Sequence, residues 1–324
     1  MENRKYHFYN IVIIIVTLLT CMVGFFSLNG MISSSMQEKT KRPIVFGSTY
    51  MTMNNPYFEV INTEIKEQIH NNGDELITMD PVLSTKRQVE QIRYLIEEGV
   101  KVIFLNPVDK DGLHDVLEEC EKADIKVIVL DTNVAEGDYY STTIVSDNYD
   151  AGVQAAKDMM KRMDHARIVL MKHSEAMSGY QRIQGFIDTI QGKEEYQIVG
   201  EGECKGQLEI SMPIMENMLQ KGLDFDVVMA LNDPAAMGCL AALQESSKED
   251  VMVYGIDGTP ETKQLIANGK MHATLAQSPL TIGKRAVEAA YRLLEGEEIE
   301  KEQIIPVSLI TSENISSYNL EGWQ

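Results

Sequence analysis

Polar side chains follow several short apolar segments of this sequence, at the point where each segment ends. The clearest case is the run 251–256 (Val-Met-Val-Tyr-Gly-Ile), which predicts a buried strand and is followed at once by Asp257. Residues 258–261 (Gly-Thr-Pro-Glu) are typical of a turn into a helix, with a cap hydroxyl and a proline in the first turn. Because ligands of open parallel sheets bind at the carboxyl ends of strands, Asp257 is a candidate ligand group.

Other polar residues occupy comparable positions near strand ends or helix starts. Helix capping or turn formation would explain each of them singly, but not a set that combines two carboxylates, side-chain amides and a guanidinium. Carboxylates accept hydrogen bonds from hydroxyls, arginine donates in a fixed fork and amides do both, so the set predicts a site for a neutral polyol. Tyr57 and Phe58 could cover the apolar face of a sugar ring or pack on a helix face. The polar candidates are Asn55, Asp131, Arg182, Asn232, Asp257 and Gln277.

The elements that must position these residues alternate regularly along the chain. The alternation of strand and helix patterns predicts an α/β fold with parallel sheets covered by helices on both faces. It runs twice, which indicates two similar lobes joined by short crossings. The predicted strands are 43–48, 75–79, 100–105, 126–130, 142–145, 167–171, 196–200, 226–231, 251–256, 271–276 and 307–310; the predicted helices are 56–71, 84–98, 111–123, 149–161, 179–191, 208–220, 234–244, 259–268 and 280–294.

Length and charge narrow the possible functions. The chain has 324 residues, enough for two lobes with their own cores, and a formal net charge of -20 from 49 acidic and 29 basic residues. Binding to nucleic acid or to an anionic membrane surface requires clustered Lys and Arg, so this charge excludes both as a main function. The four cysteines show no close pairing and no metal-ligand spacing.

The motifs of common enzyme classes are absent from the sequence. There is no Gly-x-Gly-x-x-Gly after the first strand, no phosphate loop and no Gly-x-Ser-x-Gly elbow. The six histidines show no metal spacing. His173 and Glu175 follow a predicted strand, and we interpret them as loop surface rather than as catalytic groups. We therefore predict no enzyme activity, no catalytic residues, no metal and no cofactor.

An apolar run from Ile11 to about Leu28 follows Arg4 and Lys5. Such a run, at the lower end of the length that spans a bilayer, is compatible with a retained signal-anchor helix, with a lipoprotein signal whose Cys21 is lipidated, or with a cleaved signal peptide. The basic flank places the amino end in the cytoplasm in each case. All three alternatives put the residues after about 40 outside the cytoplasmic membrane, in the periplasm if the signal is cleaved, with 29–42 as a tether.

An ordered set of short motifs in this chain resembles the ribose-type periplasmic sugar-binding proteins. This type I family shares its fold with the ligand domain of the lac repressor. No single motif is specific, but their order and spacing are, and they cover the chain from about Pro43 onward. The motifs are Asn54-Asn55-Pro56-Tyr57-Phe58, Asn106-Pro107, Leu130-Asp131, Ser146-Asp147-Asn148, Arg182-Ile-Gln-Gly-Phe186, Leu231-Asn232-Asp233, Met237-Gly238, Gly255-Ile-Asp-Gly-Thr-Pro260 and Ala276-Gln277.

The resemblance implies two Rossmann-like lobes joined by three hinge crossings, near Ser146, Ser278 and Ser308. The amino-terminal lobe would comprise residues 43–146 and 278–308, and the carboxyl-terminal lobe residues 147–277 and 309–324. Residues 1–28 would be the membrane anchor or signal. The residues carried over as ligand contacts are Asn55, Tyr57, Phe58, Asp131, Arg182, Asn232, Asp257 and Gln277.

Four positions depart from the ribose-binding pattern. Thr132 stands where those proteins have an arginine, Ile256 and Gly206 where they have aromatic residues, and Met51 where they have a serine. The pocket should therefore have one fewer guanidinium and fewer aromatic walls than a ribose site. A larger or differently substituted sugar fits such a site as well as ribose does.

The motifs, the net charge and the family resemblance leave two possible functions. One is an extracytoplasmic solute-binding protein that captures a monosaccharide or related polyol by hinge closure and delivers it to an ABC permease. The alternative is a membrane-tethered sugar sensor of the same fold, whose closure is detected by a histidine kinase or a chemoreceptor. Sugar capture is common to both.

Overall fold

The computed structural model describes residues 15–29, 42–134, 139–248 and 250–324. Residues 1–43 and 44–324 form two separate units. In the first unit, residues 15–29 are helical. Among the described residues, no helix has both the length and the apolar character needed to cross a bilayer. Residues 1–14 of the predicted anchor and 30–41 of the predicted tether lie outside the described residues.

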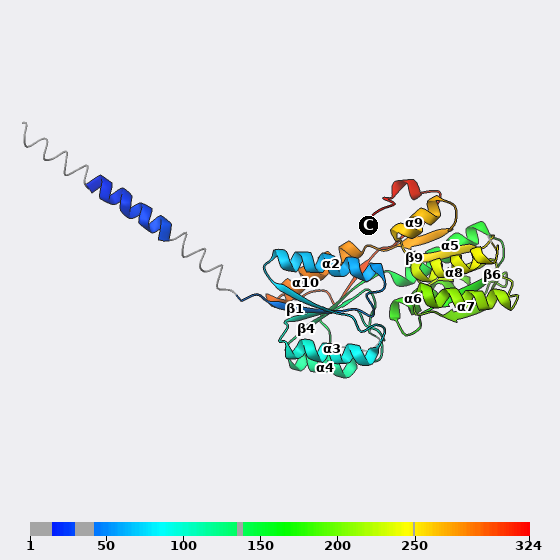
Figure 1. The fold of residues 1–324 in the computed structure, drawn as a ribbon, viewed down its shortest axis with the longest axis horizontal. Helices are drawn as coiled ribbons and strands as arrows, with labels where there is room; N and C mark the ends of the chain where they lie inside the picture. The colour runs from blue at the N-terminus through cyan, green and yellow to red at the C-terminus, as the bar shows by residue number, and fades with distance from the viewer. Residues whose placement is uncertain (1–14, 30–41, 135–138, 249) are drawn as a thin grey trace, which may run out of the picture. The chain divides into compact units, whose positions relative to one another are not determined.

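The second unit contains two six-stranded sheets (Figure 1). We call each sheet with its helices the first and the second lobe. The first sheet has the strand order β11-β5-β4-β3-β1-β2, and the second has the order β12-β10-β9-β8-β6-β7. The strands are β1 (Val45–Thr49), β2 (Glu75–Met79), β3 (Val102–Leu105), β4 (Lys126–Leu130), β5 (Thr142–Ser146), β6 (Ala166–Lys172), β7 (Tyr196–Glu203), β8 (Val227–Ala230), β9 (Met252–Asp257), β10 (Ala273–Ala276), β11 (Glu302–Ile305) and β12 (Ser308–Thr311).

Helices cover both faces of each sheet, as the alternation predicts (Figure 1). In the first lobe, α2 and α10 enclose one core with the sheet, and α3 and α4 enclose another on the opposite face. The chain passes between the two sheets three times: between β5 and β6, between β10 and β11, and between β11 and β12. The helices are α2 (Pro56–Asn71), α3 (Thr85–Glu97), α4 (His114–Lys122), α5 (Asn148–Arg162), α6 (Met177–Ile190), α7 (Leu208–Gln220), α8 (Asp233–Glu245), α9 (Pro260–Ala267), α10 (Pro279–Leu294) and the 3-10 turn η1 (Ile315–Ser317).

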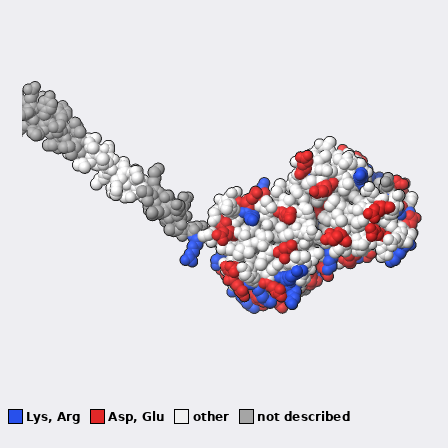
Figure 2. Space-filling model, in the orientation of Figure 1, with Lys and Arg blue, Asp and Glu red and all other residues white. Residues whose placement is uncertain are grey.

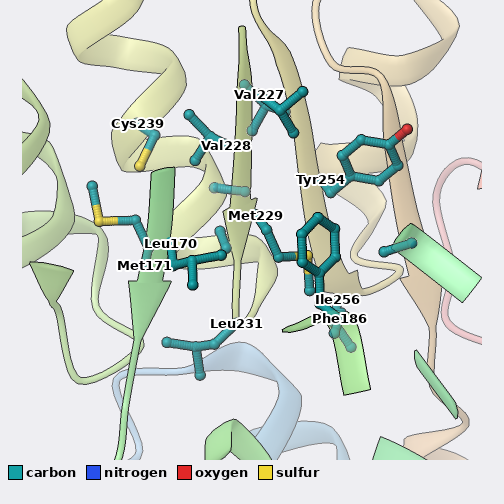
Figure 3. Close-up of a cluster of buried hydrophobic side chains, with 14 of the residues drawn as sticks. Leu170, Met171, Phe186, Val227, Val228, Met229, Leu231, Cys239, Tyr254 and Ile256 are labelled. Atoms are coloured by element: carbon teal, nitrogen blue, oxygen red, sulfur yellow. The ribbon is translucent and has the colours of Figure 1, made fainter. Parts of the chain in front are cut away.

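The core of the second lobe is built around its central strand, β8. Val227, Val228 and Met229 of this strand are fully buried between the neighbouring strands β6 and β9. Figure 3 shows Phe186 of α6 among these apolar side chains, with Ile256 of β9 close to it. A strand buried on both faces needs apolar residues at successive positions, which explains the unbroken apolar runs in the sequence.

Helices α5 and α6 approach each other closely because each has a glycine at the crossing. A Cβ at Gly152 would clash with the carbonyl oxygen of Arg182, and one at Gly185 would clash with the carbonyl oxygen of Tyr149. The two backbones are therefore in direct contact, and this contact fixes the position of the turn of α6 that carries Arg182.

Charged side chains of opposite sign lie side by side on the outer helices of the first lobe. Figure 2 shows basic and acidic side chains interspersed over α3 and α4. Arg93 forms an ion pair with Glu119 at 2.8 Å, and Lys122 forms one with Glu118 at 2.8 Å. This intermixing is unlike the continuous basic surface that nucleic-acid binding requires.

The structure corrects three details of the predicted elements. Strand β11 was not predicted, because residues 302–305 (Glu-Gln-Ile-Ile) form a partly exposed edge strand without a buried apolar run. The last strand, β12, pairs antiparallel with β10, so the second sheet is not wholly parallel. Strand β7 continues to Glu203, three residues past the predicted end, because its pairing with β6 resumes after an irregularity at Ile168 and Val169.

Candidate functional site

A cavity lies between the two lobes at the carboxyl ends of their strands. It contains about 380 Å³ of unfilled space, part of it open to solvent, but only about 20 Å³ is accessible to the centre of a water molecule. All eight residues that the sequence predicts as ligand contacts line it. The lining residues are Met51, Asn55, Tyr57, Phe58, Asp131, His173, Ala176, Ser178, Arg182, Lys205, Gly206, Gln207, Leu231, Asn232, Asp257 and Gln277.

Asp131 follows β4 and provides the carboxylate of the first lobe. Its backbone has a φ of +64°, a left-handed conformation that few residues other than glycine adopt, and its side chain is buried. The neighbouring Asn106 supports this turn, because its Nδ2 donates to the Leu130 carbonyl (3.0 Å) and its Oδ1 accepts from the Met51 amide (3.1 Å). Asn148 Nδ2 donates to the Asp131 carbonyl (3.3 Å). The surrounding amides thus hold the strained residue in place.

Asp257 ends β9 and provides the carboxylate of the second lobe. Its φ of +144° is also unusual for a residue with a side chain. Gln277, at the end of the adjacent β10, donates from Nε2 to Asp257 Oδ1 at 2.7 Å and accepts at Oε1 from the Tyr57 hydroxyl at 3.2 Å. These bonds connect α2 of the first lobe to the strand ends of the second. Asp257 is only 2% exposed, so the carboxylate lies buried at the cavity and not on the open surface of a cleft.

Arg182 lies between the two carboxylates and is itself buried. Its Nε donates to Asn148 Oδ1 at 2.8 Å, and its Nη1 donates to the Leu231 carbonyl at 3.1 Å. The distances from Nη2 to Asp131 Oδ1 (3.7 Å) and from Nη1 to Asp257 Oδ1 (3.8 Å) are those of ion pairs without hydrogen bonds. The guanidinium is therefore oriented by neutral acceptors and keeps donor capacity for a ligand.

Three buried polar atoms of these residues have no hydrogen-bond partner. They are Asp131 Oδ1, Arg182 Nη2 and Asp257 Oδ2. Buried polar groups in native proteins are almost always hydrogen-bonded, so these atoms of three charged side chains around one cavity are available to bind a ligand. The set offers two acceptors and one donor, which is the complement of a molecule that carries several hydroxyl groups.

Asn55 and Asn232 line the cavity and cap helices at the same time. Asn55 Oδ1 accepts from the Tyr57 amide at 3.0 Å, and Asn232 Oδ1 accepts from the Ala235 amide at 3.0 Å. Asn232 Nδ2 donates to the Gly206 carbonyl at 3.0 Å. The capping alternative is therefore correct for both oxygens, and the cap geometry directs both side chains toward the cavity.

Tyr57 and Phe58 provide aromatic surface from the first lobe. Both line the cavity and both are buried, with ring centroids 5.6 Å apart in an edge-on arrangement. They also belong to the core of the first lobe. Packing in the core is therefore confirmed for both side chains, while coverage of a sugar ring by them stays a prediction.

Several lining residues were not predicted from the sequence. His173, Ser178, Lys205 and Gln207 come from the loops and helix starts that follow β6 and β7. Our interpretation of His173 as loop surface is wrong, because the side chain is 3% exposed and lines the cavity. The rule that located Asp257, polar residues just past strand ends, applies to these loops as well.

Burial dominates the protonation of the site. Desolvation raises the pKa of Asp131 above its usual value, against the opposing attraction of Arg182. Desolvation likewise raises the pKa of Asp257 well above its usual value, with Asp233 and Asp131 adding to the effect. Burial lowers the pKa of His173, so its imidazole is neutral at neutral pH. A ligand that donates hydrogen bonds to the two carboxylates would favour their ionised forms.

Two of the four departures from the ribose-binding pattern do not line the cavity. Thr132 Oγ1 accepts from the Ser178 amide at 2.8 Å and so connects the two lobes. Ile256 is fully buried in the core of the second lobe. Of the described residues around the cavity, Arg182 is the only arginine, and Tyr57 and Phe58 are the only Tyr, Phe or Trp side chains. One guanidinium and two aromatic rings are consistent with the prediction of one fewer guanidinium and fewer aromatic walls than a ribose site, and Lys205 adds a second cationic side chain.

The described residues contain no group of three or more His, Cys, Asp or Glu side chains arranged to hold a metal ion. The lining residues of the cavity are groups that form hydrogen bonds or provide buried apolar surface. It provides two carboxylates, a guanidinium, amides and aromatic rings.

Comparisons with known proteins agree with this geometry. Residues 46–298 match the model of the periplasmic binding protein domain. The chain is 28% identical over 294 residues to the ribose import binding protein of Salmonella typhimurium, covering 90% of this chain and 97% of that protein. It is 29% identical to the ribose import binding protein of Bacillus subtilis, covering 84% of this chain and 88% of that protein.

The fold also matches solved structures. An ABC transporter solute binding protein from Bacillus halodurans, with bound myo-inositol, superposes with a TM-score of 0.80 at 26% identity, covering 85% of this chain and 96% of that one. These relatives are binding proteins, which supports a non-enzymatic function at the level of the family. The resemblance to type I periplasmic sugar-binding proteins is confirmed, and the chain belongs to the periplasmic binding protein domain family.

Proposed function

We propose that this protein acts outside the cytoplasmic membrane, where it captures a monosaccharide or related polyol between its two lobes. It then delivers this ligand to an ABC permease in the membrane. The observation that carries the proposal is the set of unpartnered buried atoms on Asp131, Arg182 and Asp257. Each charge-assisted hydrogen bond to such a group contributes about 1.5–3 kcal/mol, so a few of them suffice to hold a small sugar. The ribose and myo-inositol named for its relatives are polyols of the required chemistry.

The proposed mechanism is hinge closure. Contacts between the lobes cover the cavity, since Asn54 Nδ2 on the first lobe donates to Gln207 Oε1 (3.0 Å) and to Glu209 Oε1 (2.9 Å) on the second. In this arrangement of the lobes, the 20 Å³ accessible to water centres holds about one water molecule, so a bound sugar would keep the closed lobes slightly further apart than they stand here. A sugar must therefore enter while the lobes are apart, and its bonds to both lobes favour the closed state.

The three passages of the chain between the sheets are the proposed hinges. They fit the crossings near Ser146, Ser278 and Ser308, and with them the lobe limits 43–146 plus 278–308 and 147–277 plus 309–324. A permease would recognise the closed pair of lobes, because only closure presents both lobe surfaces in one fixed arrangement.

The test is a binding screen with the purified full chain. D-ribose, L-arabinose, D-allose and myo-inositol are added singly, and the melting temperature is measured. A ligand that binds only the native state stabilises it by about 2.7 kcal/mol at 100 times its dissociation constant. We expect one of these polyols to raise the melting temperature and to be recovered chemically unchanged. A panel without any shift contradicts sugar capture, and turnover of the sugar contradicts a pure binding function.

A further inference from the structure

The segment that follows β12 returns to the junction of the two lobes. After η1, residues 318–324 run past α9, and Figure 1 shows this red segment ending close to the gap between the lobes. None of its residues lines the cavity. The segment nevertheless contacts three residues that do line the cavity, Tyr57, Asp257 and Gln277.

Lys263 of α9 attaches this segment to the second lobe. Its side chain is fully buried, and its Nζ donates to the Asn319 carbonyl (2.7 Å), the Gly322 carbonyl and Gln324 Oε1 (3.2 Å). An ammonium group has three protons and is costly to bury unless each is satisfied. All three acceptors come from residues 319–324, so the buried charge fixes the path of this segment.

Gln324 supports the strand ends that carry the second-lobe ligand residues. Its Nε2 lies 3.2 Å from the carbonyl oxygens of Gly258 and Gln277 and 3.5 Å from that of Asp257. Gly258 has a φ of +74°, and a Cβ there would lie 2.5 Å from Gln324 Nε2. The amide thus sits directly behind the backbone of Asp257, whose own φ of +144° needs support from its surroundings.

Trp323 connects the same segment to the first lobe. Its ring packs on Tyr57 of α2, with centroids 5.8 Å apart and planes at 57°. Tyr57 lines the cavity and donates its hydroxyl to Gln277 Oε1. Adjacent residues of one short segment therefore contact the aromatic wall of the first lobe and the carboxylate strand of the second.

We infer that residues 319–324 form an interlobe strap that positions Tyr57, Asp257 and Gln277 for the ligand. Trp323 and Gln324 are positioning residues, since neither touches the cavity. The inference rests on the proposed function, because it assigns the strap to the same sugar site. Lobe separation must break or rearrange the Trp323–Tyr57 contact, so the strap favours closure and responds to it.

The strap itself can be tested without any sugar. Trp323 is the single tryptophan of the sequence, so the intrinsic tryptophan fluorescence of the full chain reports on this segment alone. We expect Lys263→Gln, which removes the buried charge, to shift the emission to longer wavelength and to increase quenching by acrylamide. Tyr94→Ala, on the exposed face of α3, is the control and should leave both unchanged. Equal quenching in wild type and Lys263→Gln overturns the strap.

The positioning function is tested by affinity for the polyol that gives the largest melting shift in the wild type. Trp323→Ala and Gln324→Ala should each raise its dissociation constant about tenfold, which corresponds to about 1.4 kcal/mol. Trp323→Phe keeps an aromatic ring on Tyr57 and should restore most of the affinity. A merely structural segment would lower the melting temperature of the apo protein and leave the dissociation constant unchanged, and that result overturns the inference.

The outcomes separate the strap from the proposed function. A sugar that stabilises the wild type without changing Trp323 emission contradicts the strap and leaves sugar capture standing. A panel without any binding contradicts sugar capture, and the quenching of Lys263→Gln then decides on the strap alone.

Discussion

Replacing Asp257 by asparagine separates ligand binding from stability, because the change keeps the shape of the side chain and removes its charge. In the structure, Asp257 Oδ1 accepts from Gln277 Nε2 at 2.7 Å, while Oδ2 has no partner. An asparagine can keep the first bond through its oxygen and would then place an NH2 group where the ligand needs an acceptor. The loss of one charge-assisted bond, about 1.5–3 kcal/mol, corresponds to a fall in affinity of about 10-fold to 150-fold.

The apo protein should tolerate this change. Burial raises the pKa of Asp257 well above its usual value, so keeping an ionised carboxylate here lowers the free energy of unfolding. That cost is absent below the pKa of the unfolded chain, near 4, and grows as the pH rises toward the folded pKa. Asp257→Asn should therefore be as stable as wild type at low pH and gain relative stability as the pH rises. This gain is what remains after the attraction to Arg182, 3.8 Å away, which favours the ionised form of Asp257.

Asp233→Asn is the control for stability, and because the Asp233 charge helps to raise the pKa of Asp257, it should if anything favour the ionised ligand group. Asp233 is also a buried carboxylate of the second lobe with a raised pKa, but it does not line the cavity. It accepts from the Thr259 amide (2.8 Å) and from the hydroxyls of Thr262 (2.6 Å) and Thr274 (2.7 Å). Its replacement should cost about 1–3 kcal/mol of stability and leave the dissociation constant within about threefold of wild type.

Isothermal titration calorimetry provides the dissociation constants, and urea unfolding provides the stabilities. The reasoning is refuted if Asp257→Asn binds the ligand as tightly as wild type, or if it loses as much stability as Asp233→Asn. Either result would mean that Asp257 holds the fold together instead of the ligand.

Three further predictions follow from the same geometry. Burial raises the pKa values of Asp131 and Asp257, and hydroxyl donors favour their ionised forms, so ligand binding should release protons. Calorimetry between about pH 8 and about pH 5 should therefore show the ligand affinity falling as the pH falls. An affinity that is independent of pH would contradict this prediction. Gly152→Ala should destabilise the protein by about 1–3 kcal/mol in urea unfolding, because the added methyl group clashes with the Arg182 carbonyl, and wild-type stability would show that α5 and α6 can separate freely. Asn54→Ala removes two hydrogen bonds between the lobes, which should lower the stability of the closed state by about 1 kcal/mol. Stopped-flow measurements should then show ligand dissociation about fivefold faster than in wild type. An unchanged dissociation rate would mean that these bonds are also made in the open state.

The sequence by itself determined the fold class and the location of the site. Apolar runs that end in a polar residue mark buried parallel strands, and ligand groups gather at their carboxyl ends because the loops of a parallel sheet meet there. That local rule was enough to find Asn55, Asp131, Asn232, Asp257 and Gln277, and Arg182 was found in the first turns of a helix that follows a strand. All of these line one cavity in the structure.

The tertiary structure alone decided the features that depend on contacts between distant residues. Strand β11 carries no buried apolar pattern and is a strand only because β5 offers it an edge. His173 is buried and lines a cavity to which both lobes contribute residues, which the sequence around it does not indicate. Trp323 lies 266 residues after Tyr57, and nothing in the local pattern around either residue relates them. Local propensity and periodicity act over a few residues, whereas burial, strain and ligand geometry arise from the packing of the whole chain.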